Sequence, residues 1–457
     1  MMGGLIKGPA ACGGDFSFQR ACNVLRYTVN QPIRRPGTTP IGVGGALARN
    51  PPMAGRRGVT SAPLTVAGGI FGFVWAAGTS GCRLAFGKFR GFVAPMTIGV
   101  LKEIKIGETR VSMTPSLCRR CVTLGARVLI EKSAGLTAGF TDAEYRAAGA
   151  TLVRDAAKVW RAADLILKVK EPLPAEYDLL QEGQAIFTYL HLAAGPELAK
   201  VLLKKRVLGI AYETVEGADG SFPLLKPMSQ IAGRLSIQIG AYFLQSQHGG
   251  SGVLLGGIPG TMPGHVVIVG AGNSGAHAVQ MAVGMGARVT VLDLDTRKLE
   301  ALDMEYRGRV VTLMSNPANI DNEVAGADLL IGAVLIPAAK APTVVSKRTV
   351  ARMRPGSVLV DIAIDQGGCI ESIRPTSHKH PVYEQHGVIH YAVPNMPALV
   401  GRTSTLGLTQ ATEPYVAMLV RKGIDRALGE HQGLQRGVNT EGGKIVYPAV
   451  AKALGYS

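Results

Sequence analysis

The sequence predicts an α/β fold with two doubly wound parallel sheets and an active site in the cleft between them. Two observations support this prediction. From Met96 onward, short apolar runs alternate with helical stretches, which is typical of parallel sheets covered by helices on both faces. The chain of 457 residues also exceeds the usual size of one hydrophobic core, so we expect two domains.

The first series of elements occupies residues 96–225. Strands are expected at TIGVLKE, ARVLIEK, DLILKVK, QAIFTYL and LGIAYETV, with helices at TPSLCRRCVTLG, TDAEYRAAG and GPELAKVLLKKR. Cys118 and Cys121 form a C-x-x-C within the first of these helices. No second pair with zinc-finger spacing accompanies them, so we interpret them as two thiols on a helix surface.

The second series occupies residues 226–400. It opens with a long helix at SQIAGRLSIQIGAYFLQSQ, for which Ser229 is the expected N-cap, and the glycine-rich run 249–260 follows. Six strands are then expected at HVVIVG, ARVTVLD, RVVTLM, DLLIGAV, SVLVDIA and VIHYAV, and they predict a second sheet. Residues 401–457 are expected to be helical and to return to the first domain.

Residues 1–95 differ in composition from the rest of the chain. They carry eleven Lys/Arg and one acid, Asp15, without helix or strand periodicity, which is typical of a disordered targeting leader. We expect delivery to a mitochondrion, with a plastid-type organelle as the alternative. Two other interpretations stay open: the uncharged stretch 58–82 as a marginal membrane helix, or upstream sequence translated in error, which would leave a cytoplasmic protein.

The leader also accounts for most of the net charge of +17. The remaining 38 basic and 31 acidic residues leave the body only mildly basic, and its Lys/Arg are dispersed rather than gathered in a stripe. Nucleic-acid binding is therefore not expected, nor is stable membrane insertion of the body. Four histidines between 378 and 390 lack metal-ligand spacing and are interpreted as structural or solvated, so no metal site is expected.

The stretch VVIVGAGNSGAHAVQMAVGMGARVTVLD contains the most specific motif. Gly270, Gly272 and Gly275 form G-x-G-x-x-G directly after an expected strand and at the start of a helix. Such glycines allow a tight turn, close approach of a pyrophosphate and helix-to-strand packing. Asp293 ends the next strand, where a carboxylate can bind ribose hydroxyls and would repel a 2′-phosphate. The motif predicts a Rossmann-like domain that binds NAD.

Five polar residues follow expected strands, where ligands bind in open parallel sheets. They are Arg110, Lys170 and His191 in the first series and Asp365 and Asn395 in the second. Each also has a structural interpretation: Arg110 as a solvated cation, Lys170 paired with the adjacent Glu171, His191 bonded to backbone, or Asp365 as a helix cap. Their common placement beside a cofactor fold favours a binding site.

Several long stretches resemble alanine dehydrogenase, a family that is similar to the soluble nucleotide-binding part of nicotinamide nucleotide transhydrogenase. They include GVLKEIKIGETRVSMTP, FTYLHLAAG, IAYETVEGADGSFPLLKPMSQIAGRL, LIGAVLIPAAKAP, VDIAIDQGG and VPNMPA, and the likeness runs from about Met96 to near the C-terminus. The resemblance implies reversible NAD-dependent deamination of L-alanine to pyruvate and ammonium, in a homo-hexamer. Residues 96–225 would form the substrate domain.

The resemblance also implies roles for individual residues. Arg110 and Lys170 would bind the substrate, His191 would act as acid/base at the substrate oxygen, and Asp365 would act as the second acid/base. The positions implied to contact the cofactor, besides the three glycines, are Ser229, Asp293, Lys298, Ser315, Asn395 and Met396. The alternative is a transhydrogenase-like nucleotide-binding component without amino-acid turnover. His191, Asp365 and the lack of membrane-length apolar stretches after the nucleotide domain favour the dehydrogenase.

Overall fold

The computed structural model describes residues 95–334 and 341–456. The expected leader therefore lies outside the described residues, apart from Pro95. Among the helices of the described part, none is both long and apolar enough to cross a membrane.

The first sheet has the strand order β15-β14-β6-β5-β4-β1-β2-β3. The strands from β6 to β3 in this order are parallel to one another, whereas β14 and β15 are antiparallel additions at one edge. Their bounds are β1 Thr97–Val100, β2 Arg127–Glu131, β3 Thr151–Val153, β4 Leu165–Leu167, β5 Ala185–Thr188, β6 Leu208–Ala211, β14 Val438–Glu441 and β15 Lys444–Ile445.

The helices around this sheet come from both ends of the described chain. They are α1 Pro115–Thr123, α2 Asp142–Ala147, α3 Ala156–Ala162, α4 Pro196–Lys204, α10 Gly401–Lys422, α11 Ile424–Glu430, α12 Gln432–Arg436 and α13 Pro448–Leu454. Local sequence explains where they begin: Thr114 caps α1 by accepting a hydrogen bond from Leu117 N, and Pro115 occupies the first turn. Helix α2 begins with a capping box between Thr141 and Glu144.

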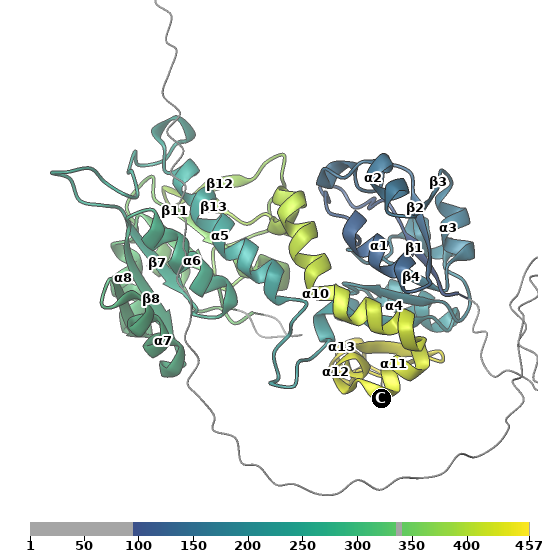
Figure 1. The fold of residues 1–457 in the computed structure, drawn as a ribbon. Helices are drawn as coiled ribbons and strands as arrows, with labels where there is room; N and C mark the ends of the chain where they lie inside the picture. Colours follow the sequence, from purple (N-terminus) through teal and green to yellow (C-terminus); the bar gives the residue numbers. More distant parts are fainter. Residues whose placement is uncertain (1–94, 335–340, 457) are drawn as a thin grey trace, which may run out of the picture. The chain divides into compact units, whose positions relative to one another are not determined.

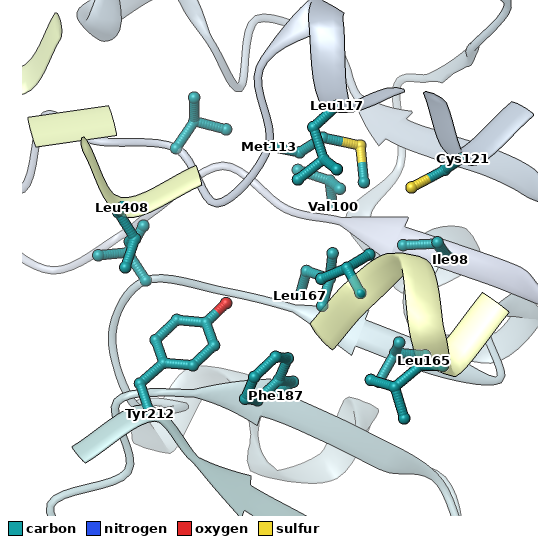
Figure 2. Close-up of a cluster of buried hydrophobic side chains, with 14 of the residues drawn as sticks. Ile98, Val100, Met113, Leu117, Cys121, Leu165, Leu167, Phe187, Tyr212 and Leu408 are labelled. Carbon is teal, nitrogen blue, oxygen red and sulfur yellow. The ribbon is translucent and has the colours of Figure 1, made fainter. Parts of the chain in front are cut away.

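The strands of the first sheet are apolar on both faces because helices cover both. Along β4, Leu165 and Leu167 join one core cluster, and Ile166 between them joins the other. Figure 2 shows the first cluster, in which side chains from β1, β4 and β5 meet Leu117 of α1 and Leu408 of α10. The period of two along each strand therefore assigns alternate residues to the two covered faces.

The second sheet has the order β12-β13-β11-β10-β7-β8-β9, and it is parallel except for β12. The bounds of its strands are β7 His265–Val269, β8 Arg288–Asp293, β9 Val310–Met314, β10 Leu329–Gly332, β11 Val358–Asp361, β12 Val382–Gln385 and β13 Val388–Tyr391. Its helices are α5 Lys226–Phe243, α6 Asn273–Gly284, α7 Thr296–Tyr306, α8 Pro317–Ala325 and α9 Lys347–Val350, with α7 and α8 drawn beside β8 and β7 in Figure 1.

Both sheets contain the same reversal of strand order. In the first, β1 lies between β2 and β4, and in the second, β7 lies between β8 and β10. At such a reversal the crossover helices on the two sides run to opposite faces, which leaves a crevice at the carboxyl ends of the strands. The two-sheet α/β fold expected from the sequence is confirmed, and the two reversals place its ligand crevices after β1 and β4 and after β7 and β10.

The C-terminal segment is not entirely helical, which corrects the sequence-based expectation. Strand β14 pairs antiparallel with β6, and β15 pairs with β14. The sequence VNTEGGKI forms this hairpin around Gly442 and Gly443, both of which have positive φ. Two further strands were not predicted: β3 on the opposite edge of this sheet and β12 on the edge of the second. Three of these four strands lie at a sheet edge and β14 lies next to one, and their sequences are short or polar.

The predicted N-cap at Ser229 is wrong. Helix α5 begins at Lys226, so Pro227 lies in its first turn and Ser229 already donates its backbone N–H to Leu225 O. Proline suits a first turn because its fixed φ is helical and its missing N–H has no partner to lose there. The side chain of Ser229 is consequently available to the pocket described below.

Cys118 and Cys121 are not on the helix surface, which is a third correction. Both side chains are fully buried, because they share with Leu117 the face of α1 that packs on the sheet. Burial raises the pKa of Cys118 to about 11 and that of Cys121 to about 12. Thiols in this state are poor nucleophiles, and we assign them a packing role.

Candidate functional site

One pocket contains residues from the strand ends of both sheets. It has a volume of about 150 Å³. Seven of the predicted site residues line it: Arg110, Lys170, His191, Ser229, Asp365, Asn395 and Met396. A larger, open hollow of about 670 Å³ is lined by uncharged residues next to Met285. The residues able to bind a carboxylate or move a proton are therefore gathered in the smaller pocket.

Arg110 is held in a network of hydrogen bonds that crosses the pocket. Its Nε and Nη2 donate to the two carboxylate oxygens of Glu108 at 2.7 and 2.6 Å, and Nη2 also donates to Asn395 Oδ1 at 2.6 Å. Asn395 Nδ2 in turn donates to Glu108 Oε2 at 2.9 Å. Since Arg110 is only 2% exposed, it is not a solvated loop cation. Its Nη1 contacts Met228 Sδ at 3.1 Å, a weak acceptor that a carboxylate could replace.

Glu108 is ionised in this network. Burial opposes its ionisation, but the hydrogen bonds and charge of Arg110, together with the amide of Asn395, outweigh burial and lower its pKa to about 2. The negative charge of Glu108 compensates that of Arg110 inside the protein. A substrate carboxylate would consequently need a second cation nearby.

Lys170 provides that cation. Its side chain is 8% exposed, and no salt bridge to it is found within residues 95–334 and 341–456. The alternative pairing with Glu171 does not form, because Glu171 bonds Lys105 Nζ at 2.5 Å. Burial lowers the pKa of Lys170, and the charge of Arg110 lowers it further, whereas Asp365 opposes this. The negative charge of a bound carboxylate would oppose both effects and raise the pKa of Lys170.

His191 follows β5 in a left-handed backbone conformation, with φ of 48°. This conformation costs about 1–2 kcal/mol for a residue with a Cβ, and it turns the side chain into the pocket. The imidazole stacks on the Tyr189 ring with 5.9 Å between centroids and 11° between planes. The ring has no hydrogen bond to backbone in the described part of the chain, unlike the structural interpretation considered above.

Asp365 lies in the short helix Ile362–Gln366 that follows β11. It is Asp361, not Asp365, that caps this helix, by accepting from Ala363 N at 2.9 Å. The exposed Asp365 carboxylate instead accepts from Asn395 N at 3.1 Å. It therefore faces the pocket from the second sheet, whereas Lys170 and His191 belong to the first.

The glycine motif forms the loop between β7 and α6. Gly270 has φ of 104°, and a Cβ added at Gly275 would lie 1.7 Å from Gly270 O, so the helix can pack there only without a side chain. A Cβ at Gly272 would meet no protein atom within 4 Å. Gly272 thus faces open space at the N-terminus of α6, where backbone N–H groups favour a pyrophosphate. This loop fits a dinucleotide.

Asp293 ends β8 and organises the same loop. Its Oδ2 accepts from Ala271 N at 2.6 Å, and its Oδ1 accepts from Asp295 N at 2.8 Å. Each carboxylate oxygen keeps a lone pair for a ribose hydroxyl. Lys298 Nζ lies 3.6 Å from Asp293 Oδ1, and Ser315 N donates to Asp293 O at 3.0 Å. Both predicted cofactor residues therefore surround Asp293 and lie outside the pocket that contains His191.

The four histidines between 378 and 390 differ in burial and in their contacts. His390 is buried, with Ser372 Oγ and Val388 O each 2.9 Å from its ring nitrogens, and the other three are exposed. No group of three or more potential metal ligands occurs in the described ranges.

Two family models match most of the described chain. The model "Alanine dehydrogenase/PNT, N-terminal domain" matches residues 99–232, and "Alanine dehydrogenase/PNT, C-terminal domain" matches residues 236–448. The chain belongs to the alanine dehydrogenase/PNT family. Alanine dehydrogenase of Methanococcus maripaludis is 56% identical over 359 residues, covering 78% of this chain and 96% of the relative. That of Bacillus subtilis is 52% identical over 362 residues, covering 79% and 95%.

Solved structures agree with this family assignment. An L-alanine dehydrogenase matches with a TM-score of 0.77 and 51% identity, covering 79% of this chain and 99% of that one. A transhydrogenase from Sinorhizobium meliloti matches with a TM-score of 0.67 and 23% identity, covering 77% and 99%. The second match shows that the fold is shared across the alanine dehydrogenase/PNT family.

Three residues that shape the site of this alanine dehydrogenase/PNT member were not predicted from the sequence: Glu108, Tyr189 and Met228. Glu108, which fixes Arg110, is two residues away in GETRV, and an acid so close to a candidate arginine is a usable signal. Tyr189 directly follows β5 and Met228 lies within α5. In the sequence both look like ordinary core residues. No periodicity distinguishes a buried methionine from one beside a guanidinium.

The replacement Glu108→Gln is expected to destabilise the protein in a pH-dependent way. A carboxyl whose pKa is lowered by folding contributes stability above its unfolded value, and this contribution is lost as the pH falls through the folded value. The destabilisation should therefore be largest above about pH 5 and shrink towards pH 2. Denaturant midpoints measured across this range, with the exposed Glu197→Gln as control, would show it; a difference that stays constant down to pH 3 contradicts the assignment.

Proposed function

We propose that the chain catalyses the reversible NAD-dependent deamination of L-alanine to pyruvate and ammonium. The observation that supports this most is the convergence of Arg110, Lys170, His191 and Asp365 on one small pocket. The relatives named alanine dehydrogenase are 56 and 52% identical over 78 and 79% of this chain. The chain is thus an oxidoreductase of a family that uses NAD.

The substrate carboxylate binds between Arg110 and Lys170. Arg110 Nη1 provides a donor whose present partner is the thioether of Met228, and Lys170 provides the charge that Glu108 does not compensate. Met228, Leu225 and Met396 line the same pocket and leave room for a small apolar side chain. Carboxylate binding in a pocket of about 150 Å³ with these apolar side chains favours a small amino acid such as alanine.

The cofactor, when bound, accepts a hydride from Cα of the amino acid. The residues of the chain then control the access of water and the transfer of protons to and from the oxygen and the ammonia nitrogen. His191 exchanges a proton at the oxygen that becomes the pyruvate carbonyl, and Asp365 exchanges protons at the nitrogen that leaves as ammonium. His191 and Asp365 face the pocket from different sheets. One can therefore act on the oxygen and the other on the nitrogen of the same substrate carbon.

Turnover of the full chain tests this function. We expect NADH oxidation only when pyruvate and ammonium are both present, and NAD reduction with L-alanine. NADH oxidation that does not need ammonium would contradict amino-acid chemistry. NADH binding without turnover on any 2-oxo acid would instead favour a transhydrogenase-like nucleotide-binding component.

A homo-hexamer is a further part of the proposal, and it rests on the family resemblance. Sedimentation of the purified chain would measure the assembly directly. A stable monomer with full turnover would overturn it.

We also propose that residues 1–95 are a leader that delivers the enzyme to a mitochondrion. The support is their composition, with eleven Lys/Arg against one acid, and the beginning of the N-terminal family match at residue 99. Fusion of residues 1–95 to a fluorescent protein tests delivery, and sequencing of the native N-terminus locates a cleavage. Plastid fluorescence would support the alternative organelle, and diffuse cytosolic fluorescence would contradict a leader.

A further inference from the structure

We propose that Glu213 is the positioning residue for His191 and acts by holding its main chain rather than its imidazole. This inference rests on the proposed function, in which His191 is an acid/base. Glu213 lies in the short helix Tyr212–Thr214 directly after β6, the strand that pairs in parallel with β5. It does not line the pocket itself.

The Glu213 carboxylate accepts hydrogen bonds from two consecutive backbone N–H groups just after β5. Oε1 accepts from His191 N at 2.6 Å, and both oxygens lie 3.2 Å from Leu190 N. Successive N–H groups next to a left-handed residue form a concave anion site, and here a side chain of the protein fills it. No lysine or arginine pairs with Glu213 in the described ranges, so its charge is directed at these two donors.

The imidazole has no other hydrogen-bonded support. A functional histidine is usually oriented by a hydrogen bond to one ring nitrogen, but no such bond is found for His191 within residues 95–334 and 341–456. Its ring is stacked on Tyr189, whose hydroxyl donates to Leu224 O at 2.6 Å. The ring plane is thus set by Tyr189, and the direction of the Cα–Cβ bond is set by the backbone conformation that Glu213 stabilises.

Without the carboxylate, the left-handed conformation of His191 loses two charge-assisted hydrogen bonds. The backbone would then relax towards the more common negative-φ regions, and the imidazole would leave its place in the pocket that it shares with Asp365. A displacement of this kind lowers the rate of proton transfer without removing any group that binds the cofactor. Glu213 therefore affects kcat through His191 alone.

A double-mutant cycle distinguishes positioning from general support of the fold. Glu213→Ala should lower kcat for pyruvate and ammonium by about tenfold or more, with the NADH Kd and the pyruvate KM changed less than about threefold. In a His191→Ala background the same replacement should lower the residual kcat by less than about twofold, because the group that it positions is already gone. Glu213→Gln, which keeps one acceptor oxygen, should give an intermediate kcat.

Glu216→Gln provides the matched control. Glu216 is three residues further on, is also half-buried, and pairs with Arg436 at 2.9 Å instead of with the site. It should leave kcat unchanged. An equal loss of kcat from Glu213→Ala in both backgrounds, or no loss in the native one, would overturn the proposal. If Glu213→Ala does not fold, the cycle is made with Glu213→Gln. Lack of turnover in the unmodified chain would refute the proposed function itself.

Discussion

Replacing His191 with alanine is expected to lower kcat by about a hundredfold or more, the usual scale for a group that transfers protons. The NADH Kd should remain nearly unchanged, because the three motif glycines and Asp293 are not among the residues that line the pocket with His191. The replacement should also cost little stability. The side chain is exposed, so the variant loses its ring contact with Tyr189 but removes little buried surface.

The measurement is steady-state turnover with pyruvate, ammonium and NADH, together with NADH fluorescence for binding. His248→Ala is a suitable control, since the His248 ring lies against that of Tyr242 near the end of α5 and does not line the pocket. Native turnover in the His191 variant would show that this histidine is not an acid/base. Loss of NADH binding in parallel with kcat would show instead that the pocket had collapsed.

Gly275→Ala is expected to weaken NADH binding by at least about a hundredfold and to lower the melting temperature as well. The new methyl would lie 1.7 Å from Gly270 O, so α6 must move away from the loop after β7. Overpacking of this kind typically costs about 1–3 kcal/mol of folding stability, which is of the same order as the packing contact between α6 and the loop that it displaces. The helix N-terminus would no longer meet the pyrophosphate, so stability and cofactor binding should fall together.

Gly272→Ala separates these two effects. A Cβ at Gly272 meets no protein atom within 4 Å, so the melting temperature without cofactor should stay the same. The methyl would project into the space that we assign to the pyrophosphate, and NADH binding should still weaken. If Gly272→Ala binds NADH normally, the cofactor does not approach the loop at this glycine. If Gly275→Ala melts like the native chain, the close packing at Gly275 is not rigid.

The sequence predicted the parts of the fold that depend on buried, regular repetition. Strands such as β5 and β7 are continuous apolar runs bounded by turns, and the strand-ends that contain Lys170, His191 and Asp365 follow from them. The strands β3, β12, β14 and β15 lie at the sheet edges or next to one, and they escaped prediction because their sequences are short and contain few consecutive apolar residues. Tertiary packing, not local sequence, decides whether such a segment is a strand.

The sequence predicted which strand ends contain the site residues, but it did not predict the contacts that these residues make. That Arg110 follows β1 could be read from the sequence, whereas its bond to Asn395 joins two segments that are 285 residues apart. The same holds for Glu213, which lies 22 residues from His191 and meets it only because β5 and β6 are neighbours. A charged residue after a strand indicates a site, but its partner is fixed by the order of the strands.

The pairing of β14 with β6 sets an order in which the protein can fold during synthesis. Gly209 N donates to Thr440 Oγ1, 231 residues further along the chain, and the whole second sheet lies between them. On the ribosome the nucleotide-binding half can therefore complete its sheet before β14 is synthesised. Until then β6 remains an open edge with unpaired backbone groups. A chain that ends before Val438 would contain every residue assigned to catalysis and would still expose that edge, so we expect C-terminal truncation to cause aggregation before it affects chemistry.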